Sequence, residues 1–170
     1  KLIVFLNAQK IAAIETSHGT MDNALNIFRG STIPVETVLD WDPTFKLENR
    51  VSRALFKKLA VPIHRKKMRR FEPMYNLPYS ELAKSHTEVP IICVGGFRKG
   101  QEIAQTLESG SADFISLCRP FIAETDFAMK LRSDMSYESE CINCNVCAVM
   151  TASEKPTVCY RHRKSDLLGE

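Results

Sequence analysis

Four cysteines toward the end of the chain have the spacing of metal ligands. Cys141, Cys144, Cys147 and Cys159 form the pattern C-x2-C-x2-C-x11-C. Thiolates separated by two residues can converge on one centre while backbone amides point at the sulfurs. Four thiolates complete either a cubane iron–sulfur cluster or a tetrahedral zinc site. The cysteines therefore predict a metal site and leave the metal open.

A glycine pair and an arginine form a second candidate site. Gly95-Gly96 follows the apolar run 91–94, and Cys118-Arg119 follows the apolar run 114–117. Because glycine has no Cβ, its backbone N–H groups can approach a bound anion closely, and Arg119 can add a charge-assisted hydrogen bond. The alternative is that the glycines only form a tight turn and that Arg119 pairs with a surface carboxylate.

The segment between the two apolar runs has the pattern of a helix. Ile103, Ala104 and Leu107 share one face, and Gly110 stands where the helix would end. Strand, helix and strand within roughly 30 residues indicate a βαβ unit with parallel strands. Both loops then leave the same edge of the sheet, which favours the phosphate interpretation, as in the clamp after strands seven and eight of a β/α barrel. The unbroken apolar runs predict strands that are covered on both faces.

Further elements are expected on both sides of this unit. The pattern predicts a strand at 11–16, mostly loop over 21–45, a helix over 46–60, short helices at 76–86 and 125–132, and a polar linker at 133–140. The helix over 46–60 carries Leu47, Val51, Leu55 and Leu59 at every fourth position, and Pro62 is expected to end it.

A dense basic run, HRKKMRR, occupies residues 64–70. It could contact a polyanion, such as nucleic acid, anionic lipid or a dinucleotide phosphate, or it could be a solvated loop. No aromatic residue is interleaved within the run, so base stacking has no support and a nucleic-acid partner is not expected. We favour the solvated loop.

Composition places the chain among ordinary globular proteins. It has 170 residues, 44% of them hydrophobic and 25% charged, with a net charge of +3. No apolar run approaches the roughly 20 residues of a membrane-spanning helix. Six cysteines without a secretion signal indicate a reducing compartment, so we expect a cytoplasmic protein. Cys93 lies within an apolar run and is expected in the core.

Several motifs together resemble a known family. The stretches AAIETSHGT, VGGF, ADFISLCRPFIAETD and CINCNVC are similar to the C-terminal part of the NADH:flavin oxidoreductases, the Old Yellow Enzyme-like group that includes relatives of 2,4-dienoyl-CoA reductase. The resemblance covers most of residues 1–160. It implies an α/β fold, the C-terminal portion of a TIM (β/α)8 barrel with a Cys-rich C-terminal extension. The partial barrel would span residues 1–132, and the extension and tail would span 133–170.

The resemblance also implies cofactors and partners. FMN would be held through its phosphate by Gly95, Gly96, Cys118 and Arg119, with NAD(P)H and a small electron acceptor as reaction partners. It favours a [4Fe–4S] cluster at the four cysteines, although the family has three residues between the second and third cysteine where this chain has two. It makes residues 2–6 the end of a helix rather than a strand. His18, which stands where the family has glycine, could face the flavin or be a surface turn residue.

The same resemblance leaves the catalytic residues unassigned. The family's first strands, which carry contacts to the flavin ring and the proton donor, have no counterpart in this sequence. We therefore expect a fragment of a flavoenzyme, or a truncated relative completed by the remaining barrel half or a partner chain, that is incomplete for catalysis by itself. The alternatives are a non-catalytic structural subunit with a zinc staple and a contact surface at 64–70, and a phosphate-binding barrel domain that does not bind flavin.

Overall fold

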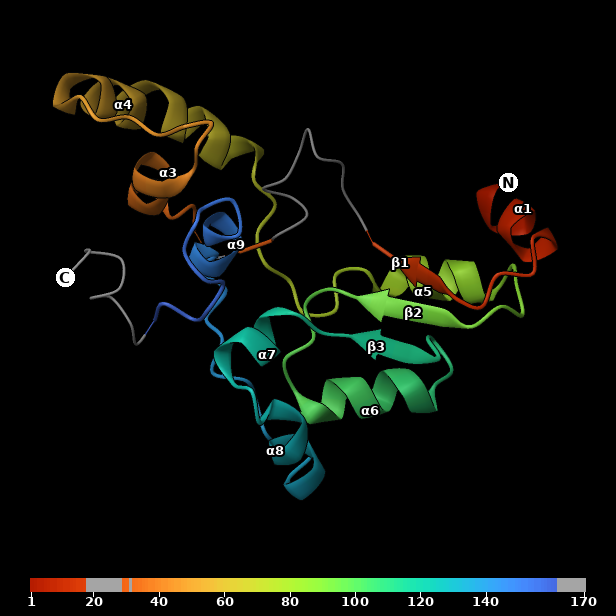
Figure 1. The fold of residues 1–170 in the computed structure, drawn as a ribbon. Coiled ribbons are helices and arrows are strands. Elements are labelled where there is room, and N and C mark those ends of the chain that lie inside the picture. Colours follow the sequence, from red (N-terminus) through yellow and green to blue (C-terminus); the bar gives the residue numbers. More distant parts are fainter. Residues whose placement is uncertain (18–28, 31, 162–170) are drawn as a thin grey trace.

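A parallel three-stranded sheet forms the centre of the molecule (Figure 1). The computed structural model describes residues 1–17, 29–30 and 32–161, so His18 lies outside the described residues. The elements in chain order are α1 (Leu2–Ala8), β1 (Ile14–Thr16), α3 (Val35–Trp41), α4 (Arg50–Lys67), α5 (Leu77–Lys84), β2 (Ile91–Val94), α6 (Gly100–Glu108), β3 (Phe114–Ser116), α7 (Arg119–Ala123), α8 (Phe127–Ser133) and α9 (Val146–Met150).

The predicted βαβ unit is confirmed. Strands β2 and β3 pair in parallel, with Cys93 opposite Ile115, and α6 connects them. Asp113 fixes the start of this pair, because its Oδ2 accepts from the backbone N–H of Ile91 at 2.7 Å and from Lys84 Nζ at 2.9 Å. Strand β1 pairs in parallel with the other edge of β2, so the order is β1-β2-β3.

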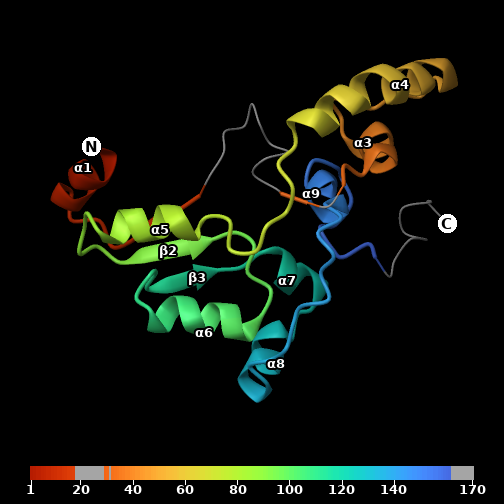
Figure 2. The same ribbon diagram turned by 180° about the vertical axis from the view of Figure 1, so that it is seen from behind.

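Helices cover the sheet unevenly. Helix α5 packs against β1 and β2, and α6 runs alongside β3 (Figures 1 and 2). Ile91 and Cys93 of β2 are fully buried, as the apolar pattern predicts. Strand β3 differs from the prediction, since Phe114 is 57% exposed. The reason is that β3 lies at the edge of the described sheet, where one side has no neighbouring element.

Helix α4 is longer than predicted, and Pro62 does not end it. The helix runs to Lys67 and takes in the first four residues of the basic run, which is therefore not simply a loop. It begins at Asn49, whose side-chain Oδ1 accepts from the backbone N–H groups of Val51 at 2.8 Å and Ser52 at 3.2 Å. Proline removes one backbone donor in mid-helix, and the turns on either side of Pro62 keep their helical form.

Helix α3, seven residues long, lies within the region 21–45 that is predicted to be mostly loop, and residues 21–28 and 31 of that region lie outside the described residues. Leu39 is fully buried and Thr37 is nearly so, because α3 packs against α9. Trp41 at its end lies under Lys155 Nζ, 4.2 Å from the ring centroid. Helix α3 thus gains its stability from a part of the chain about 110 residues away, which local pattern could not reveal.

The short N-terminal elements agree with the sequence in kind. Residues 2–8 form a helix, as the family resemblance implied, and β1 is a three-residue strand within the predicted 11–16. Among the described residues, no helix is long and apolar enough to cross a membrane. The boundary at 132/133 between barrel and extension stays a prediction.

Candidate phosphate pocket and cysteine site

The loops after β2 and β3 line one pocket beyond the carboxyl ends of the strands. Its volume is about 150 Å³, and its lining residues are Ser17, Tyr75, Asn76, Val94, Gly95, Gly96, Phe97, Arg98, Ser116, Leu117, Cys118, Arg119, Pro120 and Asn143. The four residues predicted to bind phosphate are thus brought together at one place. Whether they bind it stays a prediction.

Both the backbone conformation of the turn and the closeness of neighbouring atoms require glycine at positions 95 and 96. Gly95 and Gly96 have φ values of +119° and +86°. A Cβ on Gly95 would lie 2.6 Å from the ring of Tyr75, and one on Gly96 would lie 2.6 Å from the backbone nitrogen of Met74. The segment 72–76 therefore packs directly on the glycine loop. Tight packing and a positive φ both require glycine here.

Two backbone donors at the pocket, the N–H groups of Gly96 and Cys118, have no acceptor within the described part of the chain. The N–H of Gly95 faces β3 instead, because the parallel register pairs Val94 with Ser116. Buried or half-buried N–H groups are normally paired. Loops that present several such donors to one space can bind an anion.

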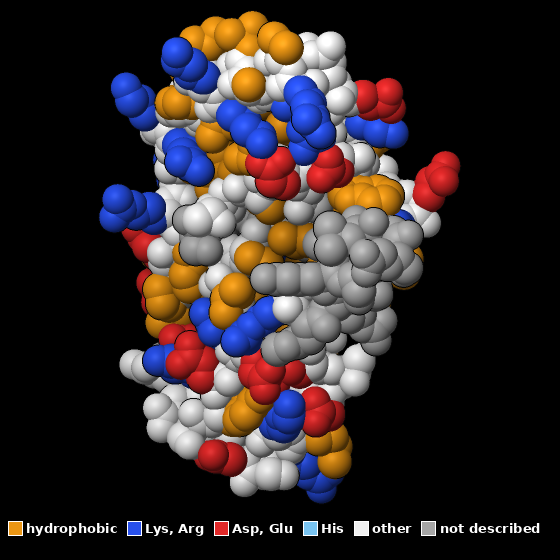
Figure 3. Space-filling model, turned by 90° about the vertical axis from the view of Figure 1, so that its left-hand side faces the viewer, with side chains coloured by type: hydrophobic (Ala, Val, Ile, Leu, Met, Phe, Trp, Pro, Cys, Tyr) orange, Lys and Arg blue, Asp and Glu red, His pale blue; other side chains and the backbone are white. Residues whose placement is uncertain are grey.

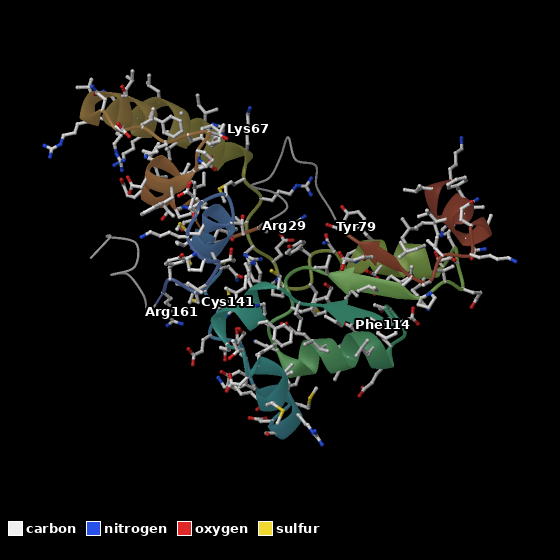
Figure 4. The ribbon with its side chains drawn as sticks, in the orientation of Figure 1. Arg29, Lys67, Tyr79, Phe114, Cys141 and Arg161 are labelled. Atoms are coloured by element: carbon white, nitrogen blue, oxygen red, sulfur yellow. The ribbon has the colours of Figure 1, made fainter. Side chains whose placement is uncertain are left out.

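Positive charge surrounds this pocket. Arg98 and Arg119 line it, and no carboxylate occurs among the described lining residues. Arg29, whose side chain is only 5% exposed, lies behind them with its guanidinium 4.4 Å from the centroid of the Tyr75 ring. Burial raises the pKa of Tyr75, and the charges of Arg119 and Arg29 act in the opposite direction. Figure 4 places Arg29 and Cys141 beyond the same ends of the strands.

Arg119 does not pair with a carboxylate in the described structure. Its Nη1 donates to the backbone carbonyl of Arg29 at 2.9 Å and to Asn145 Oδ1 at 2.8 Å. A guanidinium has five N–H donors in a planar fork. These contacts and a side-chain contact with Tyr75 fix the plane of that fork, and part of its five donors is left for a further acceptor.

The four predicted metal ligands line a second, smaller pocket. Cys141, Cys144, Cys147 and Cys159 all contribute to it, and its volume is about 20 Å³. Burial raises the pKa of the Cys147 thiol to about 11, and the neighbouring thiols add to the effect. Among the described residues, no three potential ligands are arranged so as to hold a metal ion as they stand.

Arg119 and its partner Asn145 connect the two pockets. Arg119 lines both, and Asn145 lies between the second and third cysteines. Asn145 has φ +61°, and its side chain lies against Gly30, where a Cβ would be 2.2 Å from Nδ2. The turn that carries the cysteines is therefore packed onto the residues that position Arg119.

A buried carboxylate anchors the same turn from the other side. Glu124 accepts hydrogen bonds from the hydroxyl of Ser139 at 2.8 Å, from the backbone N–H of Glu140 at 2.7 Å, and from Tyr137. The segment around Ser139 is also bonded to the residue that follows the glycine loop, because Arg98 Nη2 donates to the carbonyl of Ser139 at 2.8 Å.

Sequence reasoning missed several walls of the phosphate pocket. Arg98 stands two residues after the glycine pair and could have been included on that ground. Tyr75 and Asn76 line the pocket from a segment without a motif. Asn76 Nδ2 donates to the carbonyl of Val94 at 2.6 Å, and its buried Oδ1 has no partner within the described residues.

Comparison with known proteins identifies the relatives of this chain. A model of the NADH:flavin oxidoreductase / NADH oxidase family matches residues 46–138, more than half of the chain. The chain belongs to this family. The membership agrees with the resemblance carried by the glycine loop and by the stretch around Arg119.

Individual relatives match over shorter stretches. Cinnamate reductase of Clostridium sporogenes is 33% identical over 79 residues, which are 42% of this chain and 12% of that protein. NADH oxidase of Thermoanaerobacter brockii is 30% identical over 78 residues, 45% of this chain and 12% of that protein. A solved structure, the 6-hydroxypseudooxynicotine amine oxidase of Pseudomonas geniculata N1, matches 51% of this chain and 14% of its own at 30% identity and a TM-score of 0.41. The chain thus spans about an eighth of the curated relatives it matches.

Proposed function

We propose that this chain forms the FMN-phosphate-binding part of an NAD(P)H-dependent oxidoreductase. One observation supports the proposal: the loops after two adjacent parallel strands line a single pocket, with the unpaired N–H groups of Gly96 and Cys118, two arginines and no carboxylate among its described residues. Members of this family are flavin enzymes. A phosphate monoester is the anion that FMN would offer.

The residues of the pocket suit that ligand. The N–H groups of Gly96 and Cys118 would donate to phosphate oxygens, and Arg119 would add its remaining guanidinium donors. Asn76 Oδ1 is buried, has no donor among the residues that the structure describes, and could accept from a hydroxyl of the ribityl chain. An unpaired buried oxygen is costly, so a hydroxyl that reaches it would lower the free energy of the complex.

The size of the pocket limits what this chain holds. Pockets that enclose a whole drug-sized ligand measure roughly 300–1,000 Å³, and this one measures about 150 Å³. It can take the phosphate end of FMN and leave the ring system outside. When bound, FMN supplies hydride transfer from NAD(P)H to a small electron acceptor. The remaining part of a barrel or a partner chain would supply the ring contacts and the proton donor.

A comparison of FMN with riboflavin tests this proposal. The 170-residue chain is titrated with each flavin, and binding is followed by visible absorbance and by thermal shift. We expect FMN to bind at least about tenfold more tightly than riboflavin, because only FMN carries the phosphate. A Lys66→Ala/Lys67→Ala variant, altered far from the pocket, should bind FMN equally. Equal affinity for both flavins, or no FMN binding at high micromolar concentration, would refute the proposal.

We also propose a metal site at the four cysteines, because all of them line one small pocket. The pocket of about 20 Å³ exceeds the roughly 10–15 Å³ that admits one water-sized sphere. It therefore suits a single ion such as zinc more directly than a four-iron cubane, which would require the thiols to move apart. A zinc staple would favour the second candidate function, a non-catalytic structural subunit.

Metal analysis separates these alternatives. The protein is purified without oxygen, and its iron, zinc and visible absorption are measured. Iron with a brown colour supports the redox cluster, and one zinc in a colourless protein supports the staple. Cys144→Ser should lose the metal, whereas Cys118→Ser, an exposed cysteine outside the cluster, should keep it. Equal metal content in both variants would argue against the site. All six cysteines are free thiols.

A further inference from the structure

Helix α4 presents a row of aliphatic side chains to solvent. Val51 is 75% exposed, and Leu55, Leu59 and Ile63 are each 56% exposed. Residues four apart follow one another along one face of a helix, so these side chains form a continuous stripe, which we call the α4 stripe. Isolated exposed apolar residues are ordinary, but a continuous stripe on one face marks an interaction surface.

The segment that carries the α4 stripe is rich in cations and has no acidic residue of its own, although Arg53 and Lys57 pair with Glu36 of α3. Residues 50–70 contain nine Lys and Arg and no Asp or Glu, out of totals of 23 and 20 for the whole chain. The segment thus carries a charge of +9, while the rest of the chain carries −6. Lys58 and Lys66 lie beside the stripe at helical spacing. Figure 3 views the molecule from the side on which α4 lies, and Lys and Arg side chains gather around hydrophobic ones at the upper end of this view.

The opposite side of α4 is already engaged. Arg53 Nη2 pairs with Glu36 of α3 at 2.8 Å. The ring of Phe56 lies 6.5 Å from that of Phe45, and Val61 is 7% exposed. Figures 1 and 2 show α4 lying with α3 at the end of the molecule away from the sheet. Only one side of the helix is therefore open, and a partner must approach it as a surface rather than enclose it.

We propose that the α4 stripe docks this protein onto an anionic lipid bilayer. Such a helix lies in the plane of the membrane, with its apolar side chains among the upper acyl carbons and its cations at the headgroups. Each Lys or Arg near an anionic leaflet is attracted to it, and long basic side chains keep their charge in the headgroup region while their stems cover apolar surface. The helix stays on the surface and does not span the bilayer.

Other occupants fit these observations less well. A groove that wraps an amphipathic helix would displace the contacts of α4 with α3. Nucleic acid would be attracted by the cations but would leave the aliphatic stripe in water. Two copies paired through α4 would bring two segments of charge +9 together, which like-charge repulsion opposes. A lipid surface satisfies the stripe and the charge at once.

Vesicle binding tests the proposal. The 170-residue chain is mixed with phosphatidylcholine vesicles, with and without phosphatidylserine, and the bound fraction is measured by co-flotation. We expect binding only to the anionic vesicles, with weakening as salt is added. Leu55→Gln/Leu59→Gln should reduce the partition coefficient at least about tenfold. Leu82→Gln on α5, whose parent side chain is 61% exposed, serves as the matched control and should bind as the parent protein does.

A second experiment measures whether the α4 stripe enters the acyl region of the bilayer or only adsorbs to its surface. A Trp41→Phe/Leu59→Trp variant carries its one tryptophan on the stripe, and brominated lipid should quench its fluorescence. Absence of binding, equal binding to neutral vesicles, unchanged binding of Leu55→Gln/Leu59→Gln, or binding without quenching would each overturn the proposal. So would a concentration-dependent dimer in light scattering that the same double variant abolishes, because the stripe would then serve a second copy.

Discussion

Gly96 shows how one residue ties the pocket to the segment that covers it. Its φ of +86° is unfavourable for any side chain, and a Cβ would also lie 2.6 Å from the nitrogen of Met74 and 2.8 Å from the carbonyl of Glu72. Both neighbours are backbone atoms, which cannot rotate away. Gly110 has a similar φ of +71° but has nothing within 4 Å of its missing Cβ. A comparison of substitutions at Gly96 and Gly110 therefore separates the cost of backbone strain from the cost of overpacking.

We expect Gly96→Ala to lower the free energy of unfolding by roughly 2–4 kcal/mol, as the sum of left-handed strain and overpacking. Gly110→Ala should cost only about 1–2 kcal/mol, because strain acts there alone. Urea unfolding monitored by circular dichroism measures both. Equal losses in the two variants would show that segment 72–76 does not pack on the loop as described.

Glu124 is a second single residue that stabilises the site, through the turn that carries the cysteines. Burial opposes its ionisation, but hydrogen bonds from Tyr137, Ser139 and Lys130 and from a backbone N–H outweigh that effect and lower its pKa from 4.5 to about 2. The carboxylate is therefore more stable in the folded chain than in the unfolded one. Its contribution is fully present above pH 4.5 and is lost as the pH falls toward 2.

Replacement by glutamine should remove that pH dependence. We expect Glu124→Gln to lower stability at neutral pH by roughly 2–3 kcal/mol and to flatten the fall in stability between pH 4.5 and 2. Glu138→Gln, at an exposed carboxylate that pairs with Arg98 at 3.4 Å, should stay within about 1 kcal/mol of the parent. Urea midpoints across this pH range provide the measurement. A parallel pH profile for parent and Glu124→Gln would contradict the assignment.

At the scale of elements, α4 depends on the residue that caps its N-terminus. Asn49 Oδ1 accepts two backbone N–H groups that the helix leaves unpaired, at 2.8 and 3.2 Å. We expect Asn49→Ala to destabilise the helix by about 1 kcal/mol, whereas Asn49→Asp should preserve the cap and benefit from the helix dipole. Hydrogen exchange of the α4 amides measures the effect. Protection that is the same in both variants would show that the helix does not need this cap.

Helices and strands whose own residues show the expected apolar periodicity could be predicted from the sequence. Those stabilised by contacts with distant parts of the chain could not. The strand–helix–strand pattern around Gly95 and Gly110 fixed β2, α6 and β3 because each carries its own periodicity. Helix α3 has no such pattern and is held by α9. Pro62 is a strong local signal for a helix end, but a helix that is already established on both sides tolerates one missing hydrogen bond. Apolar residues at every fourth position predicted a helix here, but neither its bounds of Arg50–Lys67 nor the exposure of its apolar stripe to solvent.

At the scale of the whole molecule, the sheet brings distant residues to one edge. Parallel pairing could be predicted from the sequence, so the two loops could be predicted to meet. The remaining walls of the pocket could not, because Tyr75 and Asn76 belong to a segment that lacks a motif. The family membership is carried by residues 46–138, which contain the glycine loop and Arg119 but not the four cysteines. The phosphate pocket therefore has more support than the metal site.

The most direct test of the pocket is to observe its backbone donors while ligand is added. Amide proton–nitrogen NMR spectra of the 170-residue chain are recorded during a titration with FMN. We predict that the amides of Gly96 and Cys118 shift most and saturate together, as N–H groups that gain a phosphate acceptor do. Shifts confined to the basic residues of α4, with these two amides unmoved, would contradict the account.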